Sequence, residues 1–133
     1  MTPKPVCGIW PTTRRLVAVI ERDGRVGAAA SIAPTTEARW GFVAWLSASG
    51  VATLVTTEAL ADDELLAIAR EAGIEVWLAP ANLVEAVRVA AALTRRPPRH
   101  TAGLLARWLT QSALRQHLHH VGAAPHERQL HLW

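Results

Sequence analysis

Apolar and β-branched positions in the first eighty residues fall into five short runs. The first three runs lie at 7–11, 16–20 and 26–33, and the Asp-Gly step between the second and third is typical of a tight hairpin turn. The last two, at 51–57 and 74–79, are mostly apolar, like strands buried on both faces of a parallel sheet. The pattern therefore predicts five strands that begin with an antiparallel hairpin.

Helical periodicity fills the two intervals that separate the later strands. One helix is expected to begin at a Thr35 or Thr36 cap and to stop at Gly50, and a second to begin at an Asp62 cap and to stop at Gly73. The expected inward positions are Ala38, Phe42, Trp45 and Leu46 in the first helix and Leu65, Ile68, Ala69 and Ala72 in the second. Strands that alternate with amphipathic helices predict an α/β fold with a mixed sheet and parallel crossovers.

After residue 80 the pattern becomes helical. Asn82 and Glu85 have the spacing of a capping box, which predicts a helix to about Leu93. Residues 94–100 contain Arg-Arg-Pro-Pro-Arg and are expected to form a loop, because consecutive prolines do not continue a helix.

A last helix is expected to begin at a Thr101 cap. Its expected apolar side is Leu104, Leu105, Trp108 and Leu109, with Ser112. We expect one domain over residues 1–120, with these C-terminal helices, and an irregular tail over 121–133.

Composition narrows the class of protein. Half of the 133 residues are apolar, which favours a folded core. No apolar run approaches the roughly 18 residues that span a bilayer, so we expect no membrane segment. The one cysteine, Cys7, excludes an internal disulfide and fits a small buried residue in a cytoplasmic protein.

Charge is distributed unevenly along the chain. Thirteen of the fourteen basic residues are arginines, seven of them after Glu85, where the only acid is Glu127. A basic half of this kind predicts an anionic partner such as DNA or RNA. The candidate phosphate contacts are Arg95, Arg96, Arg99, Arg107 and Arg115.

Several strings also follow one another in the order of a known family. They are Gly8-Ile9-Trp10-Pro11-Thr12, then Thr57-Glu58-Ala59-Leu60, then Ala79-Pro80, and then the stretch from Arg99 to Arg107. In this order the chain, over about residues 6–110, resembles the N-terminal RuvC-like (RNase H-fold) domain of DEDD insertion-sequence transposases, the Piv and bridge-RNA-guided recombinase group. The resemblance implies an RNase H-like fold with a five-stranded mixed sheet and flanking helices.

The family's catalytic acids are mostly replaced. The resemblance places its aspartates at Trp10, Pro98 and Thr101, and only its glutamate is kept, as Glu58. Two-metal phosphoryl transfer needs several carboxylates to hold the ions. We therefore expect no catalytic residue, no bound metal and no cofactor. Glu58 is either an inherited position without a role or one half of a structural ion pair.

Two other groups of residues are weaker candidates for chemistry. The acids at 62–64 are better explained as residues favoured at a helix N-terminus than as substitutes for the missing metal ligands. The histidines near the C-terminus are His117, His119, His120, His126 and His131. They are expected at an exposed helix end that runs into the tail. The i, i+3 spacing of His117 and His120 nevertheless permits weak binding of a divalent metal.

Three functions remain open on this reading. The preferred one is a catalytically inactive, transposase-derived domain that binds nucleic acid or regulates a mobile element. The second is a protein-interaction module that self-associates through the last helix and the tail ending in Trp133. The third is an active metal-dependent nuclease. Most tryptophans are expected in the core or an interface, although aromatic side chains also stack on bases.

Overall fold

A computed structural model describes residues 4–12, 14–58, 62–111 and 115–121. Its centre is a single mixed sheet in the order β3-β2-β1-β4-β5-β6. The strands are β1 (Val6–Pro11), β2 (Leu16–Arg22), β3 (Arg25–Ile32), β4 (Thr53–Thr57), β5 (Glu75–Ala79) and β6 (His119–His120). Strand β2 is antiparallel to both of its neighbours, β1 and β3, whereas β1, β4 and β5 are parallel, as predicted.

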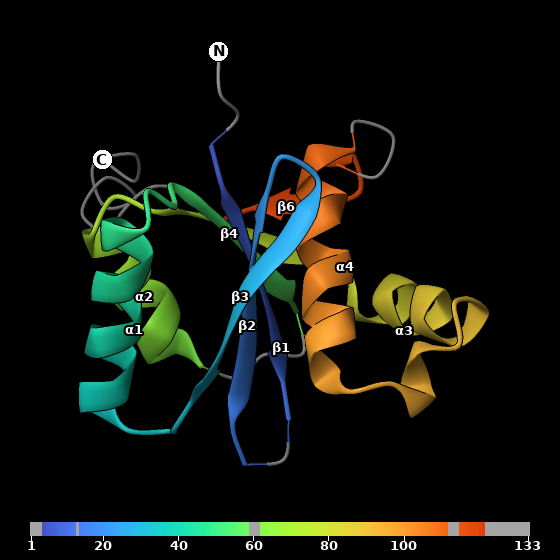
Figure 1. Ribbon diagram of the computed structural model, residues 1–133, viewed down its shortest axis with the longest axis horizontal. Coiled ribbons are helices and arrows are strands. Elements are labelled where there is room, and N and C mark those ends of the chain that lie inside the picture. The colour runs from blue at the N-terminus through green and yellow to red at the C-terminus, as the bar shows by residue number, and fades with distance from the viewer. Residues whose placement is uncertain (1–3, 13, 59–61, 112–114, 122–133) are drawn as a thin grey trace, which may run out of the picture.

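Helices cover both faces of this sheet (Figure 1). They are α1 (Thr36–Ala48), α2 (Asp63–Glu71), α3 (Ala81–Ala90) and α4 (Pro98–Thr110), with a 3₁₀ turn η1 (Leu93–Arg95) before α4. One core cluster lies under α1 and α2, and a second lies under α3 and α4. The molecule is thus a three-layer α/β sandwich with β1 inside the sheet.

The caps and stops of α1 and α2 agree with the sequence patterns. The side chain of Thr35 accepts a hydrogen bond from Ala38 N at 3.1 Å, and that of Asp62 accepts one from Leu65 N at 2.9 Å. Gly50 and Gly73 follow the two helices with φ of 79° and 82°, a region that glycine adopts without strain. The predicted inward positions of both helices are buried or half-buried except Ala72, which is the exposed C-cap of α2.

The start of α3 differs from the prediction. The helix begins at Ala81 with Pro80 as its cap residue, and no side chain caps it. Asn82 instead accepts a hydrogen bond from the adjacent Leu83 N at 2.9 Å. The capping-box interpretation is therefore wrong, and Glu85 is free to pair with Arg88 one turn later.

The expected loop over residues 94–100 is also wrong in most of its length. Residues 93–95 form η1, and α4 begins at Pro98 with Pro97 as its cap residue in extended conformation. Proline is well suited to the first helical position, because its N–H would have no intrahelical acceptor and its φ is already helical. Thr101 is consequently a buried residue inside α4 rather than its cap.

The remainder of α4 follows the predicted amphipathic pattern. Leu105, Trp108 and Leu109 are buried, and Leu104 is half-buried. The helix ends at Thr110, before residues 112–114, which lie outside the described part together with Ser112. Arg107 therefore lies on α4, whereas Arg115 lies beyond its end.

A sixth strand was not predicted. His119 and His120 pair antiparallel with Leu78 and Trp77 of β5, where a helix end was expected. Preceding Leu118 is buried, and the rings of Trp77 and His120 meet edge to face with centroids 4.7 Å apart. These non-local contacts fix β6 in a stretch that has no strand pattern of its own. The predicted tail falls almost wholly on residues 122–133, outside the described part.

Helix α4 lies directly against β1. A Cβ added to Gly8 would collide with the carbonyl oxygen of Ala102 and lie 2.7 Å from Ala106 N. Only glycine permits this approach. Arg107 approaches Glu21, which pairs with Val6 at the start of β1, and Thr101 lies near Trp10 at the other end. Helix α4 thus runs antiparallel to β1, and its first turn lies at the carboxyl end of that strand.

Candidate nucleic-acid interface

Trp10 is the residue at which the resemblance places the first catalytic acid. It lies on β1, an internal strand that pairs with β4 in parallel from Val6–Thr53 to Gly8–Val55. Thr56 Oγ1 donates a hydrogen bond to Ile9 O at 3.0 Å and extends this contact. Trp10 therefore lies on an internal strand beside β4, the strand that Glu58 directly follows.

The structure brings Trp10 and Thr101 together through Arg88. The Arg88 guanidinium lies over the Trp10 ring, with Cζ 4.5 Å from the centroid, a cation–π geometry. Arg88 Nε also donates to Thr101 Oγ1 at 3.3 Å. At two positions where the resemblance places acids, the chain thus has the indole of Trp10 and the buried hydroxyl of Thr101, and the Arg88 guanidinium contacts both. We call Trp10, Arg88 and Thr101 the arginine cluster.

The third replaced position, Pro98, is the first residue of α4 and is exposed. It precedes Thr101 by three residues, so both positions share one side of the helix. The two positions at which the resemblance places aspartates, Pro98 and Thr101, therefore lie one helical turn apart in α4. Their side chains offer no carboxylate.

Glu58, the one retained acid, follows β4 directly. Its backbone N–H donates to Ala79 O at 3.0 Å, which continues the β4–β5 pairing. The carboxylate Oε1 lies 3.6 Å from His119 Nε2 on β6. Of the two roles left open for Glu58, this contact favours a structural ion pair, formed when His119 is protonated.

The resemblance to DEDD transposases implies divalent metal, and the side chains of the arginine cluster do not fit it. Mg²⁺ prefers carboxylate and carbonyl oxygens, whereas this cluster presents an indole, a guanidinium and one hydroxyl. In the part of the chain that the structure describes, the only carboxylate in hydrogen-bond contact with Arg88 is that of Glu85, at 2.9 Å. Among the described residues, no group of three or more His, Cys, Asp and Glu side chains has the geometry to hold a metal.

The neighbouring acids of the α2 N-terminus are used for structure. Asp62 caps α2 and also accepts two hydrogen bonds from Arg39 Nε, at 2.9 and 3.0 Å. Glu64 accepts a third bond from the same guanidinium at 3.3 Å. Arg39 belongs to α1, so this network ties the two helices together, and it explains why these acids stand where they do.

The histidines near the C-terminus do not converge. His117 is exposed, while His119 and His120 each face a different carboxylate, those of Glu58 and Glu75 at 3.6 and 3.5 Å. His126 and His131 lie outside the described residues. The i, i+3 pair of His117 and His120 therefore spans a turn and a strand rather than one helical face.

The five predicted phosphate contacts separate into two groups. Arg95, Arg96 and Arg99 are exposed on the stretch from η1 through the first turn of α4, at the carboxyl end of β1. Arg107 lies at the opposite end of α4, and Arg115 lies over the Trp77 ring at 5.4 Å. The residues of the first group share an end of the molecule with the arginine cluster. Residues of the second group do not.

Arg107 has a local partner in Glu21. The Glu21 carboxylate is buried between β2 and α4, 4.0 Å from Arg107 Nε, and its Oε2 atom has no hydrogen-bond partner among the described residues. Desolvation by burial raises the pKa of Glu21, and the Arg107 charge and the Thr110 hydroxyl offset part of that rise. Arg107 therefore compensates a buried acid, and sequence patterns gave no signal for this contact.

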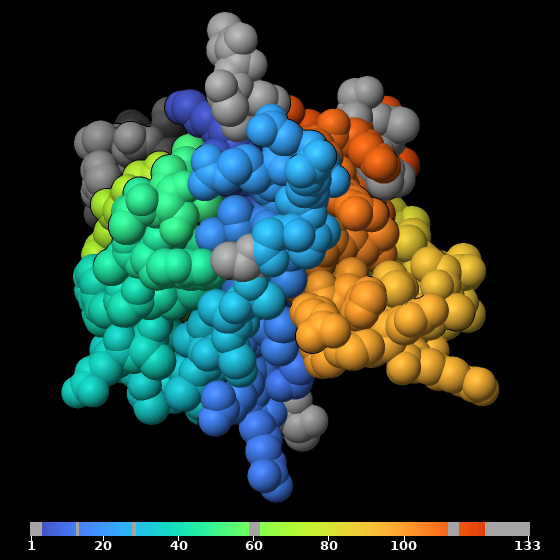
Figure 2. Space-filling view, in the orientation of Figure 1, coloured from blue at the N-terminus to red at the C-terminus, as the bar shows by residue number. Residues whose placement is uncertain are grey.

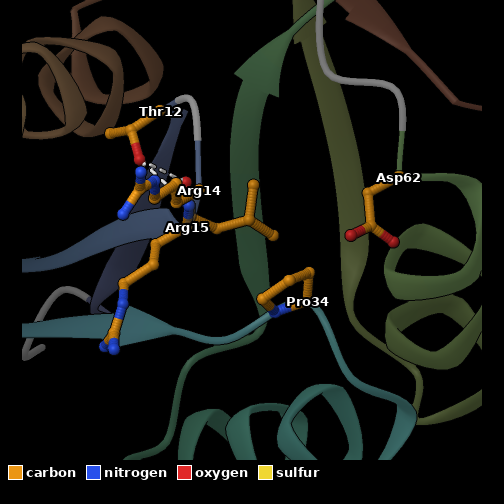
Figure 3. Close-up of a pocket in the computed structure, with 6 residues that line it drawn as sticks. Thr12, Arg14, Arg15, Pro34 and Asp62 are labelled. Carbon is orange, nitrogen blue, oxygen red and sulfur yellow. Dashed lines mark hydrogen bonds between the residues drawn. The ribbon is translucent and has the colours of Figure 1, made fainter.

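Two further arginines, which the sequence reasoning missed, lie after β1. Arg14 and Arg15 are exposed in the turn to β2, and the side chain of Thr12 closes that turn by hydrogen bonds to the backbone of Arg15 at 2.8 and 3.1 Å. They line a shallow pocket of about 360 Å³, with Asp62 on its other side (Figure 3). Both lie in the N-terminal part of the chain, whose net charge is negative. The uneven distribution of charge along the sequence therefore pointed only to the C-terminal arginines.

These arginines give the molecule one basic end. In Figure 2 the blue segment after β1 projects from the bottom of the molecule, and the yellow-orange segment around the start of α4 projects at its lower right. The described arginines of these two segments are Arg14, Arg15, Arg95, Arg96 and Arg99. We call this set the basic end.

A second concave surface runs along α4 towards β3. Its volume is about 460 Å³, and it combines apolar side chains with two of the predicted contacts, Arg99 and Arg107. Val26 is an exposed large apolar residue here, and Leu93 and Leu104 also line the groove. This mixture favours an amphipathic partner rather than a polyanion alone.

Aromatic and sulfur side chains mostly belong to the core. Trp108 is buried, Trp45 and Trp77 are half-buried, and Trp40 is exposed. Burial raises the pKa of the Cys7 thiol to about 12, which agrees with a structural residue. No described helix has the length and apolarity that a bilayer crossing demands.

Comparison with known proteins identifies the architecture. RuvC from Thermus thermophilus superimposes with a TM-score of 0.64 and 17% identity over 88% of this chain and 99% of that one. The fold is that of RuvC. A T. thermophilus RuvC in complex with a Holliday junction substrate matches with a TM-score of 0.62 and 17% identity, over 90% of this chain and 100% of that one. No family model matches the chain, and no curated protein matches it.

Proposed function

We propose that this chain is a nucleic-acid-binding domain on a RuvC fold that no longer cleaves its ligand. The observation that carries the proposal is the arginine cluster. On a RuvC fold, the internal strand β1 and the first turn of α4 meet where the resemblance places acids, and here a guanidinium lies between an indole and a hydroxyl. A cation attracts a phosphodiester, but without several carboxylates the site does not assemble two metal ions.

The basic end supports the binding half of the proposal. Its five arginines are exposed, and the described residues offer them no ion pair. Arg95, Arg96 and Arg99 are therefore the principal candidates for phosphate contact. Arg107 and Arg115 remain predictions, with less support, because each contacts a neighbouring side chain and lies away from the basic end.

The transposase resemblance supports a finer version of the proposal. The strings at Gly8-Ile9, Glu58-Ala59 and Arg99–Arg107 occur in the family's order, and the described ones fall on β1, the end of β4 and α4. We propose that the domain derives from such a transposase and serves a mobile element as a binding or regulatory module. An Arg-rich surface and a RuvC fold are both consistent with DNA or RNA as the partner.

Fluorescence anisotropy with labelled duplex and single-stranded DNA tests the binding half. Neutralisation of three phosphates predicts a log-log salt slope of about −2 to −3. An Arg95/Arg96/Arg99→Ala variant should lose most of the affinity and of the slope. The matched control is a Lys4/Arg25/Arg70→Ala variant, which removes three charges at the other end of the parallel strands and should bind within about twofold of wild type, because exposed charges farther than a Debye length are largely screened.

Binding that is absent at low salt, or equal loss in both triple variants, would refute the proposal. The second candidate, a self-associating module, then becomes the better one, since the groove along α4 carries apolar side chains of Val26, Leu93 and Leu104. An apolar dimer should be nearly insensitive to salt, and sedimentation at low and high salt separates it from a nucleic-acid-dependent assembly.

A further inference from the structure

Arg88 is not among the arginines that the sequence singled out, yet it is the most constrained of those at the carboxyl end of β1. Its side chain is 19% exposed and is held by residues from three elements. Trp10 on β1 stacks on it, Thr101 on α4 accepts from Nε, and Glu85 on α3 accepts from Nη1. We propose that Arg88 is a seat for one backbone phosphate of a bound nucleic acid, at the place where the resemblance puts the catalytic aspartate of β1.

The hydrogen-bond inventory of the guanidinium leaves room for such a ligand. An arginine side chain has five N–H groups in a fixed fork. Two of them are engaged, one on Nε and one on Nη1, and no other side-chain or backbone acceptor among the described residues bonds the rest. A phosphate takes two parallel N–H bonds from such a fork, so the three free groups suffice for bidentate binding.

The charge of the cluster is also only partly compensated. The single carboxylate that pairs with Arg88 belongs to Glu85, whose side chain is 57% exposed and whose attraction is therefore screened by solvent. Trp10 contributes an electron-rich face rather than a charge. A phosphate would thus meet a positive, pre-oriented donor, and it would displace no buried ion pair.

The surroundings favour a strand of nucleic acid over an isolated anion. Arg95 and Arg96 precede the helix that carries Thr101 and Arg99 lies in its first turn, while Arg14 and Arg15 follow the strand that carries Trp10. The arginine cluster thus joins the two elements, β1 and α4, that connect directly to the two halves of the basic end. Exposed arginines attract a polyanion over a distance, and the fixed Arg88 then sets the position of its backbone.

This inference rests on the proposed function, and an Arg88→Gln variant separates the two. We expect anisotropy titrations with single-stranded and duplex DNA to show at least tenfold weaker binding than wild type, because a charge-assisted bidentate contact is lost. The salt slope should also become shallower by about 0.9, the value of one phosphate contact. The control is Arg70→Gln, a half-buried arginine that bonds Leu66 O within α2, away from the basic end.

A purely structural role for Arg88 predicts a different pattern. Loss of the clamp between α3, β1 and α4 would lower the melting temperature but leave the salt slope of the folded protein unchanged, and that result would overturn the inference. If wild type binds and Arg88→Gln binds equally well, the inference fails while the proposed function stands. If wild type does not bind, both fail.

Arg88→Lys keeps the inference testable if the Gln variant does not fold. Lysine retains the charge and most of the aliphatic stem, but it presents a point charge in place of a planar fork. We expect the salt slope of wild type with an affinity several-fold lower. Wild-type affinity in Arg88→Lys would contradict a bidentate seat. Inorganic phosphate added as a competitor at constant ionic strength should displace labelled DNA only weakly. Displacement by phosphate as complete as that by unlabelled DNA would assign the site to a free anion.

Discussion

The contact between β1 and α4 at Gly8 gives the account its sharpest stability prediction. Replacing Gly8 by Ala adds a Cβ that would collide with Ala102 O and lie 2.7 Å from Ala106 N. Ordinary contact begins at 3.4 Å, so the contact with Ala106 N alone demands a shift of 0.7 Å, and the shorter contact with Ala102 O demands a larger one. Both contacted atoms are backbone, so no side-chain rotation relieves the collision, and the helix must move as a body against the rest of its core.

Overpacking of a close-packed core costs about 1–3 kcal/mol, and a collision with helix backbone should reach the upper end of that range. For a domain of this length, about 3 kcal/mol corresponds to a fall of roughly 10 °C in melting temperature. Thermal and urea unfolding, followed by circular dichroism, measure the change. Hydrogen exchange should show the greatest loss of protection in α4, because the collision separates that helix from β1.

Gly41→Ala is the matched control, since a Cβ added at this position in α1 meets nothing within 4 Å. Alanine is the better helix former, so this variant should gain about 0.5–1 kcal/mol in free energy of unfolding. A Gly8→Ala variant as stable as wild type, or a Gly41→Ala variant that loses as much, would refute the packing of α4 on β1 described above.

Two further predictions concern acids. Burial raises the pKa of Glu21, so the folded state holds the carboxyl proton more tightly than the unfolded state does. The resulting stability is fully present below the unfolded pKa of about 4.3. It is lost as pH rises through the higher pKa of the folded state. Glu21→Gln should therefore stabilise the protein at pH 7, by about 1 kcal/mol, and lose this advantage below pH 4 in urea titrations; a variant less stable at pH 7 would contradict the assignment. Asp62→Ala should lower the free energy of unfolding by about 2 kcal/mol, because it removes the α2 cap and the acceptor of Arg39. The control, Asp63→Ala, should change it by less than about 0.5 kcal/mol. Equal losses in chemical denaturation would count against the network.

Local signals were sufficient for the first two helices and for the order of the strands. Thr35 and Asp62 cap by bonds to residues three positions away, and the continuous apolar runs coincide with mostly buried strand positions in β1, β2 and β4. Such features depend on neighbours in sequence, so the sequence predicted them. The start of α4 was missed because proline was taken as a helix breaker, although at Pro98 it occupies the one position that favours it.

The site depended on contacts that no local pattern carries. The resemblance identified Trp10 and Thr101 as replaced positions, but the cation between them comes from α3, and its stacking on Trp10 spans most of the chain. In the same way β6 forms through pairing with β5, and Arg107 meets a glutamate from β2. Charge counted along the chain predicted a basic surface. It did not predict which arginines share an end of the folded molecule.

The most direct test of the central claim asks whether the domain binds a strand and leaves it intact. Labelled single-stranded, duplex and four-way-junction DNA, each at a protein concentration that saturates binding, would be incubated with millimolar Mg²⁺ or Mn²⁺ and resolved on a denaturing gel. The account predicts bound DNA of unchanged length with wild type and with Glu58→Gln alike. Defined cleavage products that form with wild type and disappear with Glu58→Gln would contradict it.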